Sequence, residues 1–170
     1  MKKKFNTIFI MLIFTAFQSL ASGLNNRLEY VENYNSYAIE NMRIYKIPAS
    51  ITLAQGILES GSGQSELARK SNNHFGIKCG SYWTGGKTYH DDDAKNECFR
   101  TYNSVLESYN DHSEFLTKNK RYSDLFLLNM NDYKAWAKGL SKAGYATNPN
   151  YASRIIVSLK TSNCILLTKK

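Results

Sequence analysis

The chain has 170 residues, of which 42% are hydrophobic and 21% charged, and its formal net charge is +8. This composition excludes a disordered or fibrous protein, and without repeats or low-complexity segments it predicts one globular domain. The positive charge suits an anionic polymer as partner. Lysine and arginine do not form the consecutive basic blocks typical of nucleic-acid binding, so we expect no nucleic-acid partner.

The N-terminus has the pattern of a secretory signal peptide. Three lysines precede an apolar run at residues 8–14, and Ser19 and Ala21 have the small side chains of a signal-peptidase site. Because the apolar run is short for a transmembrane helix, we expect residues 1–21 to be cleaved and residues 22–170 to be exported, to the periplasm or the cell exterior, without stable membrane insertion. An uncleaved membrane anchor is the alternative.

Two helices are predicted next. Apolar residues at helical spacing indicate a first helix over residues 24–45 and a second that starts near Pro48. The second is apolar on more than one face, which predicts burial. Glu59 lies at its C-terminal end, where Gly61 and Gly63 stop the helix.

A change of pattern at about residues 75–102 predicts a small β lobe. Glycines punctuate short β-type runs at 87–90 and 98–102, and three aspartates at 91–93 form the turn region between them. Helical periodicity then returns. The expected fold class is therefore α+β, mainly helical with one small β-hairpin lobe. The later helical stripes lie at residues 105–116, 133–140 and 152–159.

The cysteines indicate a disulfide. Export favours oxidation, and Cys79 and Cys98 flank the predicted hairpin, so we pair them and leave Cys164 as a free or exposed thiol. The rival interpretation is a metal site that adds His74 and His90 to the paired cysteines. Its spacing matches no standard zinc pattern, and we expect no metal and no cofactor.

Glu59 is the candidate for acid–base chemistry. A carboxyl at the end of a buried helix is half sheltered, and both burial and the negative end of the helix dipole favour its protonated form. Such a group can protonate a leaving oxygen, as glycosidases require. The alternative is a helix-surface glutamate that only ends the helix near a turn.

Three motifs carry a family resemblance. They are Leu-Glu-Ser-Gly-x-Gly at residues 58–63, Asn-x-Phe-Gly-Ile-Lys at 73–78 and Ala-Gly-Tyr-Ala-Thr at 143–147. In this order they resemble glycoside hydrolase family 73, the endo-β-N-acetylglucosaminidases that cleave peptidoglycan and include the wall-hydrolase domain of flagellar rod assembly proteins. The resemblance runs from about Tyr45 to Leu159. It implies a lysozyme-like fold with a groove between lobes, and Glu59 as the catalytic acid.

A second carboxylate is expected in the hairpin. Glycoside hydrolysis commonly uses two carboxyl groups, and the resemblance places the second one here. In an extended strand alternate residues share a face, so Asp91 and Asp93 would point together. We favour either of them over Glu97, which adjoins a cysteine. A solvated acidic turn is the alternative.

Tyr145 is the candidate for a different route. The acetamido oxygen of the substrate can itself attack the anomeric carbon, and a protein group must then position the acetamide or steady the developing charge. The resemblance places Tyr145 at the active site and implies that it contributes to activity. A core tyrosine that closes a helix end beside Gly144 is the alternative.

Aromatic side chains can stack on sugar rings, and several lie near the motifs. Gln55, one turn before Glu59, is expected to orient the acid or bind a sugar, or simply to be a packed polar residue. The expected substrate contacts are Gln55, Asn73, Phe75, Tyr82, Trp83 and Tyr89.

The sequence departs from the family pattern at two positions, with Ser62 where tryptophan is frequent and Asn148 where aspartate is common. We expect a monomeric, exported endo-β-N-acetylglucosaminidase whose partner is the peptidoglycan glycan strand. A muramidase or lytic transglycosylase on the same polymer is the close rival, because lysozyme-like folds host all three reactions. A catalytically inactive wall-binding module is the rival from another class, and chitin or a glycoprotein core glycan is a weaker substrate alternative.

Overall fold

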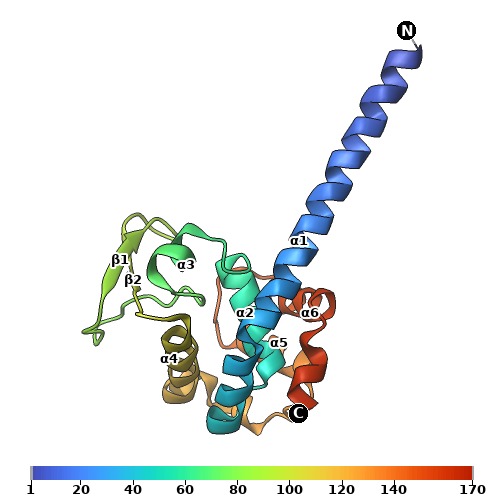
Figure 1. Cartoon of the computed structure of the whole chain (residues 1–170). Coiled ribbons are helices and arrows are strands. Elements are labelled where there is room, and N and C mark those ends of the chain that lie inside the picture. Colours follow the sequence, from blue (N-terminus) through green and yellow to red (C-terminus); the bar gives the residue numbers. More distant parts are fainter. Residues whose placement is uncertain (1, 170) are drawn as a thin grey trace.

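The computed structural model describes the backbone of residues 2–169 and the side chains of residues 18, 21–165, 167 and 168. Figure 1 shows the helices gathered around α2, with the two strands at one side. In chain order the elements are α1 (Lys2–Tyr45), α2 (Ala49–Ser60), α3 (Glu66–Ser71), β1 (Lys87–His90), β2 (Glu97–Arg100), α4 (Val105–Lys118), the 3-10 helix η1 (Lys120–Leu127), α5 (Tyr133–Lys142), α6 (Tyr151–Thr161) and the 3-10 helix η2 (Cys164–Lys169).

Most of the predicted signal peptide, residues 1–21, lies outside the side chains that the structure describes, so the cleavage site stays a prediction. The backbone of this segment belongs to α1, which continues to Tyr45. Within the described part of the chain, no helix is both long enough and apolar enough to cross a membrane.

Helix α2 is the central helix, as its all-round apolar character predicts. Its residues from Ala49 to Ile57 are buried. One face, with Ile51 and Ala54, packs into a cluster built with η1, α5 and α6. The opposite face, with Leu53 and Ile57, packs into a second cluster built with α1 and α4. The helix therefore forms part of both apolar clusters, and only its last turn is left less covered.

The last turn of α2 ends at Gly61. This residue has φ +58, in the left-handed region, and its N–H donates to the carbonyl of Ile57. Glycine adopts that conformation without the strain that a Cβ brings. The expected helix end is confirmed, and it leaves Glu59 in the final turn, half-buried.

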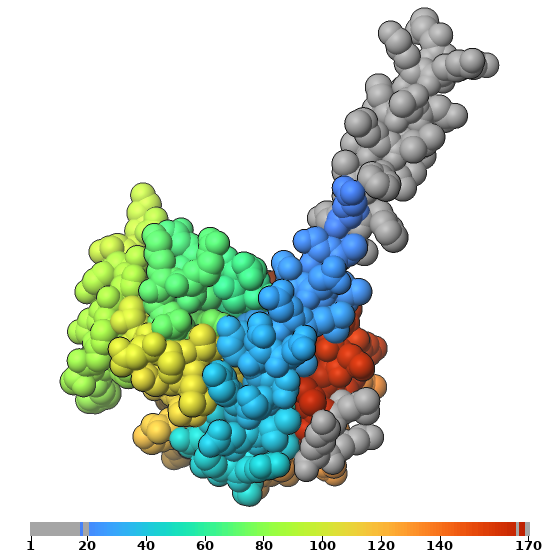
Figure 2. Space-filling model, viewed as in Figure 1, coloured from blue at the N-terminus to red at the C-terminus, as the bar shows by residue number. Residues whose placement is uncertain are grey.

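The β lobe is a two-stranded antiparallel hairpin in which Tyr89 pairs with Cys98. The second strand begins one residue earlier and ends two residues earlier than predicted. The short helix α3 was not predicted; it begins after Ser65, whose side chain accepts from Ala68 N–H. Figure 2 shows this lobe, in light green, at the side of the molecule away from the C-terminal helices.

Three kinds of contact hold the β lobe in place. The predicted disulfide between Cys79 and Cys98 is confirmed, with the two Cα atoms 5.5 Å apart. The Cys79 N–H also donates to the Cys98 carbonyl at 2.9 Å. From the end of β2, Arg100 donates to both carboxylate oxygens of Asp111 on α4, at 2.8 and 2.9 Å. The hairpin is thus fixed both to the preceding loop and to the helical body.

Cys164 is free and buried, and its sulfur pairs with the hydroxyl of Ser162. This resolves the prediction that left its exposure open.

We expect the double substitution Cys79→Ser and Cys98→Ser to lower the free energy of unfolding by about 3 kcal/mol, because the unfolded chain regains the entropy of an open loop. Native-state hydrogen exchange should speed up at the amides of residues 79 and 100, which donate within the lobe, and stay slow in α5. Cys164→Ser is the control, and it should leave the hydrogen-exchange rates of the β lobe unchanged. Equal lobe protection in the double variant and the parent would contradict the expected role.

Candidate active site

A groove of about 920 Å³ runs between the β lobe and the helical body. Its walls come from the last turn of α2, the loop at 75–80, the acidic turn at 91–93, and the segment at 144–148. Arg121 from η1 and Arg154 from α6 also line it. The groove thus brings together the three sequence motifs, which are far apart along the chain.

Glu59 lies in this groove with one buried oxygen. Among the described residues, none forms a hydrogen bond with its Oε1 atom. Burial is the largest influence on this carboxyl and raises its pKa above the usual range for glutamate. Because burial disfavours the charged form, Glu59 holds its proton to a higher pH than an exposed glutamate does.

A buried hydrogen-bonded pair positions the acid. The amide nitrogen of Gln55 donates to the hydroxyl of Tyr151 at 3.0 Å, and both side chains are buried. The hydroxyl of Tyr151 also acts on Glu59: it favours the charged form and so opposes the effect of burial on the pKa of that carboxyl. Gln55 therefore acts on Glu59 through Tyr151, and its side chain is fully buried, away from a sugar in the groove.

Two charges in the groove wall act on Glu59 in opposite directions. The guanidinium of Arg154 lowers the pKa of Glu59, whereas the carboxylate of Asp92 raises it. Both effects are smaller than that of burial. The acid is therefore tuned by one residue from α6 and one from the β lobe.

Tyr145 lines the groove beside this pair. Its ring stacks on that of Tyr151, with centroids 5.6 Å apart and an interplanar angle of 15°. Its hydroxyl donates a long hydrogen bond of 3.5 Å to the Phe75 carbonyl. Burial, followed by the charge of Glu59, raises its pKa well above the ordinary value, so Tyr145 offers a neutral hydroxyl next to the acid.

The acidic turn surrounds a lysine. The ammonium of Lys78 lies 2.9 Å from Glu97, 3.1 Å from Asp93 and 3.5 Å from Asp92. Asp91 instead accepts from the Asn96 N–H at 2.8 Å. The strand premise for pairing Asp91 with Asp93 is wrong, because β1 ends at His90 and strand alternation does not continue into the turn. Both residues nevertheless line the groove, and their role stays a prediction.

Asn73 and Phe75 shape the wall next to the hairpin. The Asn73 amide donates to the carbonyls of Ile77 and Arg100, and its oxygen accepts from the N–H groups of Phe75 and Ile77. These bonds use the whole amide and fix the loop. Phe75 belongs to the groove lining, although its side chain is mostly buried against the stacked imidazole of His112.

The other expected aromatic contacts lie on the β lobe outside the groove. Tyr82 is almost fully exposed and Tyr89 is exposed, whereas Trp83 donates to the Gly86 carbonyl and stacks on Arg100. None of the three belongs to the described lining of the groove. His90 does line it, so its neighbour Tyr89 points to the opposite face of the strand.

The rival metal site has lost its sulfur ligands, because the disulfide uses both Cys79 and Cys98. The carboxylates of Asp92, Asp93 and Glu97 lie close enough together to hold a cation. The ammonium of Lys78 already occupies the position between them and compensates their charge.

Sequence reasoning missed Tyr151, Arg154 and Asp92. A signal for the first two was present, because residues three apart share a helix face and this pair lies one turn apart at the start of a predicted helix. Asp92 belongs to the acidic turn, but strand alternation selects its neighbours Asp91 and Asp93 instead.

The fold and the groove define a lysozyme-like glycoside hydrolase. The structure matches a peptidoglycan hydrolase from Sphingomonas sp. A1 with a TM-score of 0.71 and 28% identity, covering 84% of this chain and 92% of that one. It also matches the glycoside hydrolase domain of Salmonella typhimurium FlgJ, with a TM-score of 0.66 and 30% identity over 81% of this chain and 89% of that one. The predicted fold class is confirmed.

Residues 35–163 match the family model described as mannosyl-glycoprotein endo-beta-N-acetylglucosaminidase. The chain therefore belongs to this glucosaminidase family, and the predicted resemblance is confirmed. Among curated relatives, it is 33% identical to the peptidoglycan hydrolase FlgJ of Vibrio parahaemolyticus, over 75% of this chain and 44% of that protein. It is 35% identical to the exo-glucosaminidase LytG of Bacillus subtilis, over 74% of this chain and 48% of that protein. The chain thus spans less than half the length of these relatives.

The opposed charges around Glu59 predict opposite shifts of the pH–rate profile. If Glu59 is the proton donor, as expected from the sequence, activity falls as pH rises through its pKa. Arg154→Gln should raise that pKa and move the alkaline limb of kcat/KM to higher pH. Asp92→Asn should move the limb to lower pH. Lys160→Gln, an equal charge change at an exposed position on the same helix, is the control, and shifts of the same sign in both test variants would contradict this assignment.

Proposed function

We propose that the protein is an exported endo-β-N-acetylglucosaminidase that hydrolyses the β-1,4 bond on the reducing side of N-acetylglucosamine in peptidoglycan. The observation that carries the proposal is the buried, unpartnered oxygen of Glu59 in an open groove. Membership of the glucosaminidase family supports the reaction, and the name of the FlgJ relative, a peptidoglycan hydrolase, supports the polymer.

In the proposed first step, Glu59 donates its proton to the glycosidic oxygen as the bond to the anomeric carbon breaks. Its raised pKa favours the protonated form to a higher pH than in an exposed glutamate, which suits a proton donor. The contact with Tyr151, itself bonded to Gln55, restrains the carboxyl. The oxocarbenium-like charge that develops then needs an anion or a nucleophile on the other side of the sugar.

Two groups of residues can meet that need. Asp91 and Asp93 remain our proposed second carboxylates, joined by Asp92, because all three line the groove. Among the three acids paired with Lys78, Asp92 lies farthest from the ammonium, at 3.5 Å. Its charge also raises the pKa of Glu59. In the substrate-assisted alternative the acetamido oxygen attacks, and the neutral hydroxyl of Tyr145 positions it.

The proposed substrate contacts divide into two sets. Phe75 contributes to the groove wall. The exposed rings of Tyr82 and Tyr89 and the half-buried ring of Trp83 offer stacking surfaces farther out on the β lobe. Gln55 and Asn73 position other groups from buried sites.

We further propose that residues 1–21 direct export and that residues 22–170 work as one monomeric catalytic domain at the cell wall. The relatives named as peptidoglycan hydrolases support an extracytoplasmic role. The proposal includes no nucleic-acid partner and no cofactor.

Glu59→Gln should lower turnover on purified peptidoglycan by about 10³-fold, since the amide cannot donate the proton, while wall binding and thermal stability stay close to those of the parent. Mass spectrometry of borohydride-reduced digests should show reduced N-acetylglucosamine ends with the parent protein only. Asn148→Asp, in the groove lining but at a position where aspartate is common in the family, is the active control.

Other products would contradict the proposed reaction and identify a different one. Reduced N-acetylmuramic ends would identify a muramidase, and anhydro-sugars a lytic transglycosylase. Release of single sugars from chain ends would identify an exo-acting enzyme. Binding without products from the parent protein would identify an inactive wall-binding module.

A further inference from the structure

A second hollow lies on the other side of the end of α2. It has a volume of about 490 Å³ and is formed by the middle of α1, the end of α2 and residues 153–158 of α6. This volume is within the range of small-ligand sites. Its lining comprises Gly23, Asn26, Arg27, Ile57, Leu58, Gly61, Ser62, Ser153, Arg154, Val157 and Ser158.

The charged residues in the described lining of this hollow are both basic, although one of them, Arg154, also acts on Glu59 in the groove. Two arginines, Arg27 and Arg154, belong to its described lining, and none of the described lining residues is acidic. Arg27 donates to the hydroxyl of Thr161 at 2.7 Å. Since a guanidinium has five N–H donors, this single bond anchors Arg27 and leaves most of its donors for a ligand.

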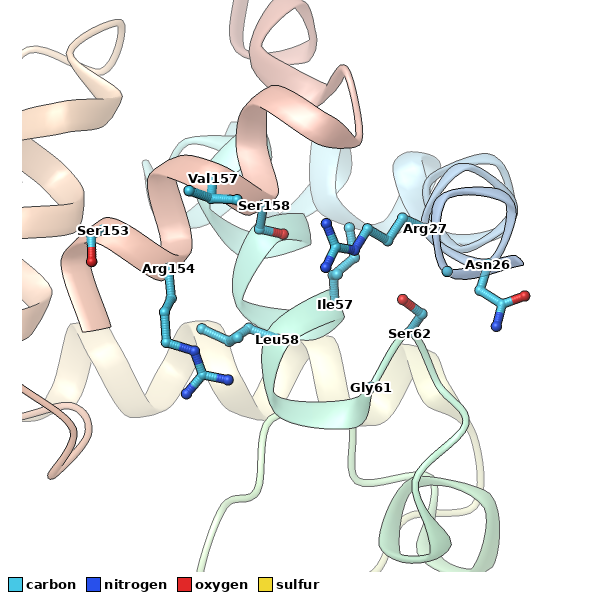
Figure 3. Close-up of a pocket in the computed structure, with 11 residues that line it drawn as sticks. Asn26, Arg27, Ile57, Leu58, Gly61, Ser62, Ser153, Arg154, Val157 and Ser158 are labelled. Atoms are coloured by element: carbon cyan, nitrogen blue, oxygen red, sulfur yellow. The ribbon is translucent and has the colours of Figure 1, made fainter. Parts of the chain in front are cut away.

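A buried hydroxyl without a partner faces the same space. Ser158 is only 4% exposed, and among the described residues none lies within hydrogen-bonding distance of its Oγ atom. Figure 3 shows this oxygen pointing toward the guanidinium of Arg27, with the hydroxyl of Ser62 turned toward the same region. Unpartnered buried hydroxyls are uncommon because they forgo a hydrogen bond, so this one is an available partner for a ligand.

The middle of the hollow is apolar. Leu58 lies between Arg154 and Ile57 in Figure 3, so the two guanidiniums stand on either side of aliphatic side chains. This arrangement suits an elongated molecule with separated anionic groups and small apolar side chains between them, and suits a compact phosphate less. Guanidinium forks bind carboxylates through paired hydrogen bonds.

We propose that the hollow between α1, α2 and α6 binds the carboxylates of short acidic peptides, the class of peptide carried by peptidoglycan strands. Arg154 lines both this hollow and the catalytic groove, so a peptide attached to a strand in the groove can reach it past that side chain. The link to the strand rests on the proposed function. Carboxylate binding itself does not.

Binding is tested first, with the full chain and the free peptide Ala–γ-Glu–Lys–Ala. Nuclear magnetic resonance titration should shift the side-chain Nε–H of Arg27 and the amides of Ser62 and Ser158. Arg27→Gln should weaken binding by about tenfold, as the loss of a charge-assisted contact does, and Arg27→Lys by less. Arg43→Gln, exposed near the other end of α1, should change nothing.

The ligand controls separate carboxylate recognition from general anion binding. The same peptide with its carboxylates converted to carboxamides should not bind. Equal binding of the carboxamide form, or binding of inorganic phosphate in preference to the peptide, would overturn the proposal. So would an affinity for the free peptide that is the same in Arg27→Gln and in the parent.

Hydrolysis tests the link to the strand. With peptide-bearing strands, Arg27→Gln should raise KM about tenfold without changing kcat, and with strands stripped of peptides by an amidase it should match the parent. If Arg27→Gln and the parent have equal KM values on the peptide-bearing strands as well, the hollow does not bind strand-linked peptides. Free peptides would then be its ligand. If the parent cleaves neither substrate, the proposed function fails, whereas the titration still decides whether the hollow binds carboxylates.

Discussion

Helix α2 packs against the protein core on two opposite faces. The candidate active site depends on the last turn of this helix, which carries Glu59 and is less covered. The apolar residues of α2 contribute to both core clusters, so the helix cannot shift without opening one of them. Gly61 ends the helix where the cover thins. Glu59 is thereby held by the rigid interior and exposed to the groove on one side, which is the environment that raises the pKa of a carboxyl without removing its access to substrate.

The opposite wall of the groove depends on covalent and ionic contacts, because a two-stranded hairpin is too small to be stable by itself. The disulfide joins the hairpin to the preceding loop, and the Arg100–Asp111 pair joins it to α4. The ammonium of Lys78 gathers the acidic groups of the turn. These contacts determine where the aspartates stand relative to Glu59.

Arg154 connects the two hollows of the molecule. On the groove side its charge acts on the acid, and on the other side it lines the space that also contains Arg27 and Ser158. Occupation of the second hollow by an anion would compensate part of that charge. If the proposed site binds an anion, Arg154 would couple that binding to the protonation of Glu59.

The sequence by itself determined the helical class, the buried α2 with Glu59 at its end, the hairpin and the pairing of Cys79 with Cys98. Each of these follows from local periodicity, a helix-ending glycine or a short loop, all of which are properties of neighbouring residues. Tertiary structure alone decided that Tyr151 connects Gln55 to the acid, that the acidic turn encloses Lys78 and that Arg154 faces two hollows. These arrangements join residues as far apart as positions 55 and 151, and their contacts are set by how whole helices pack, which local patterns do not encode.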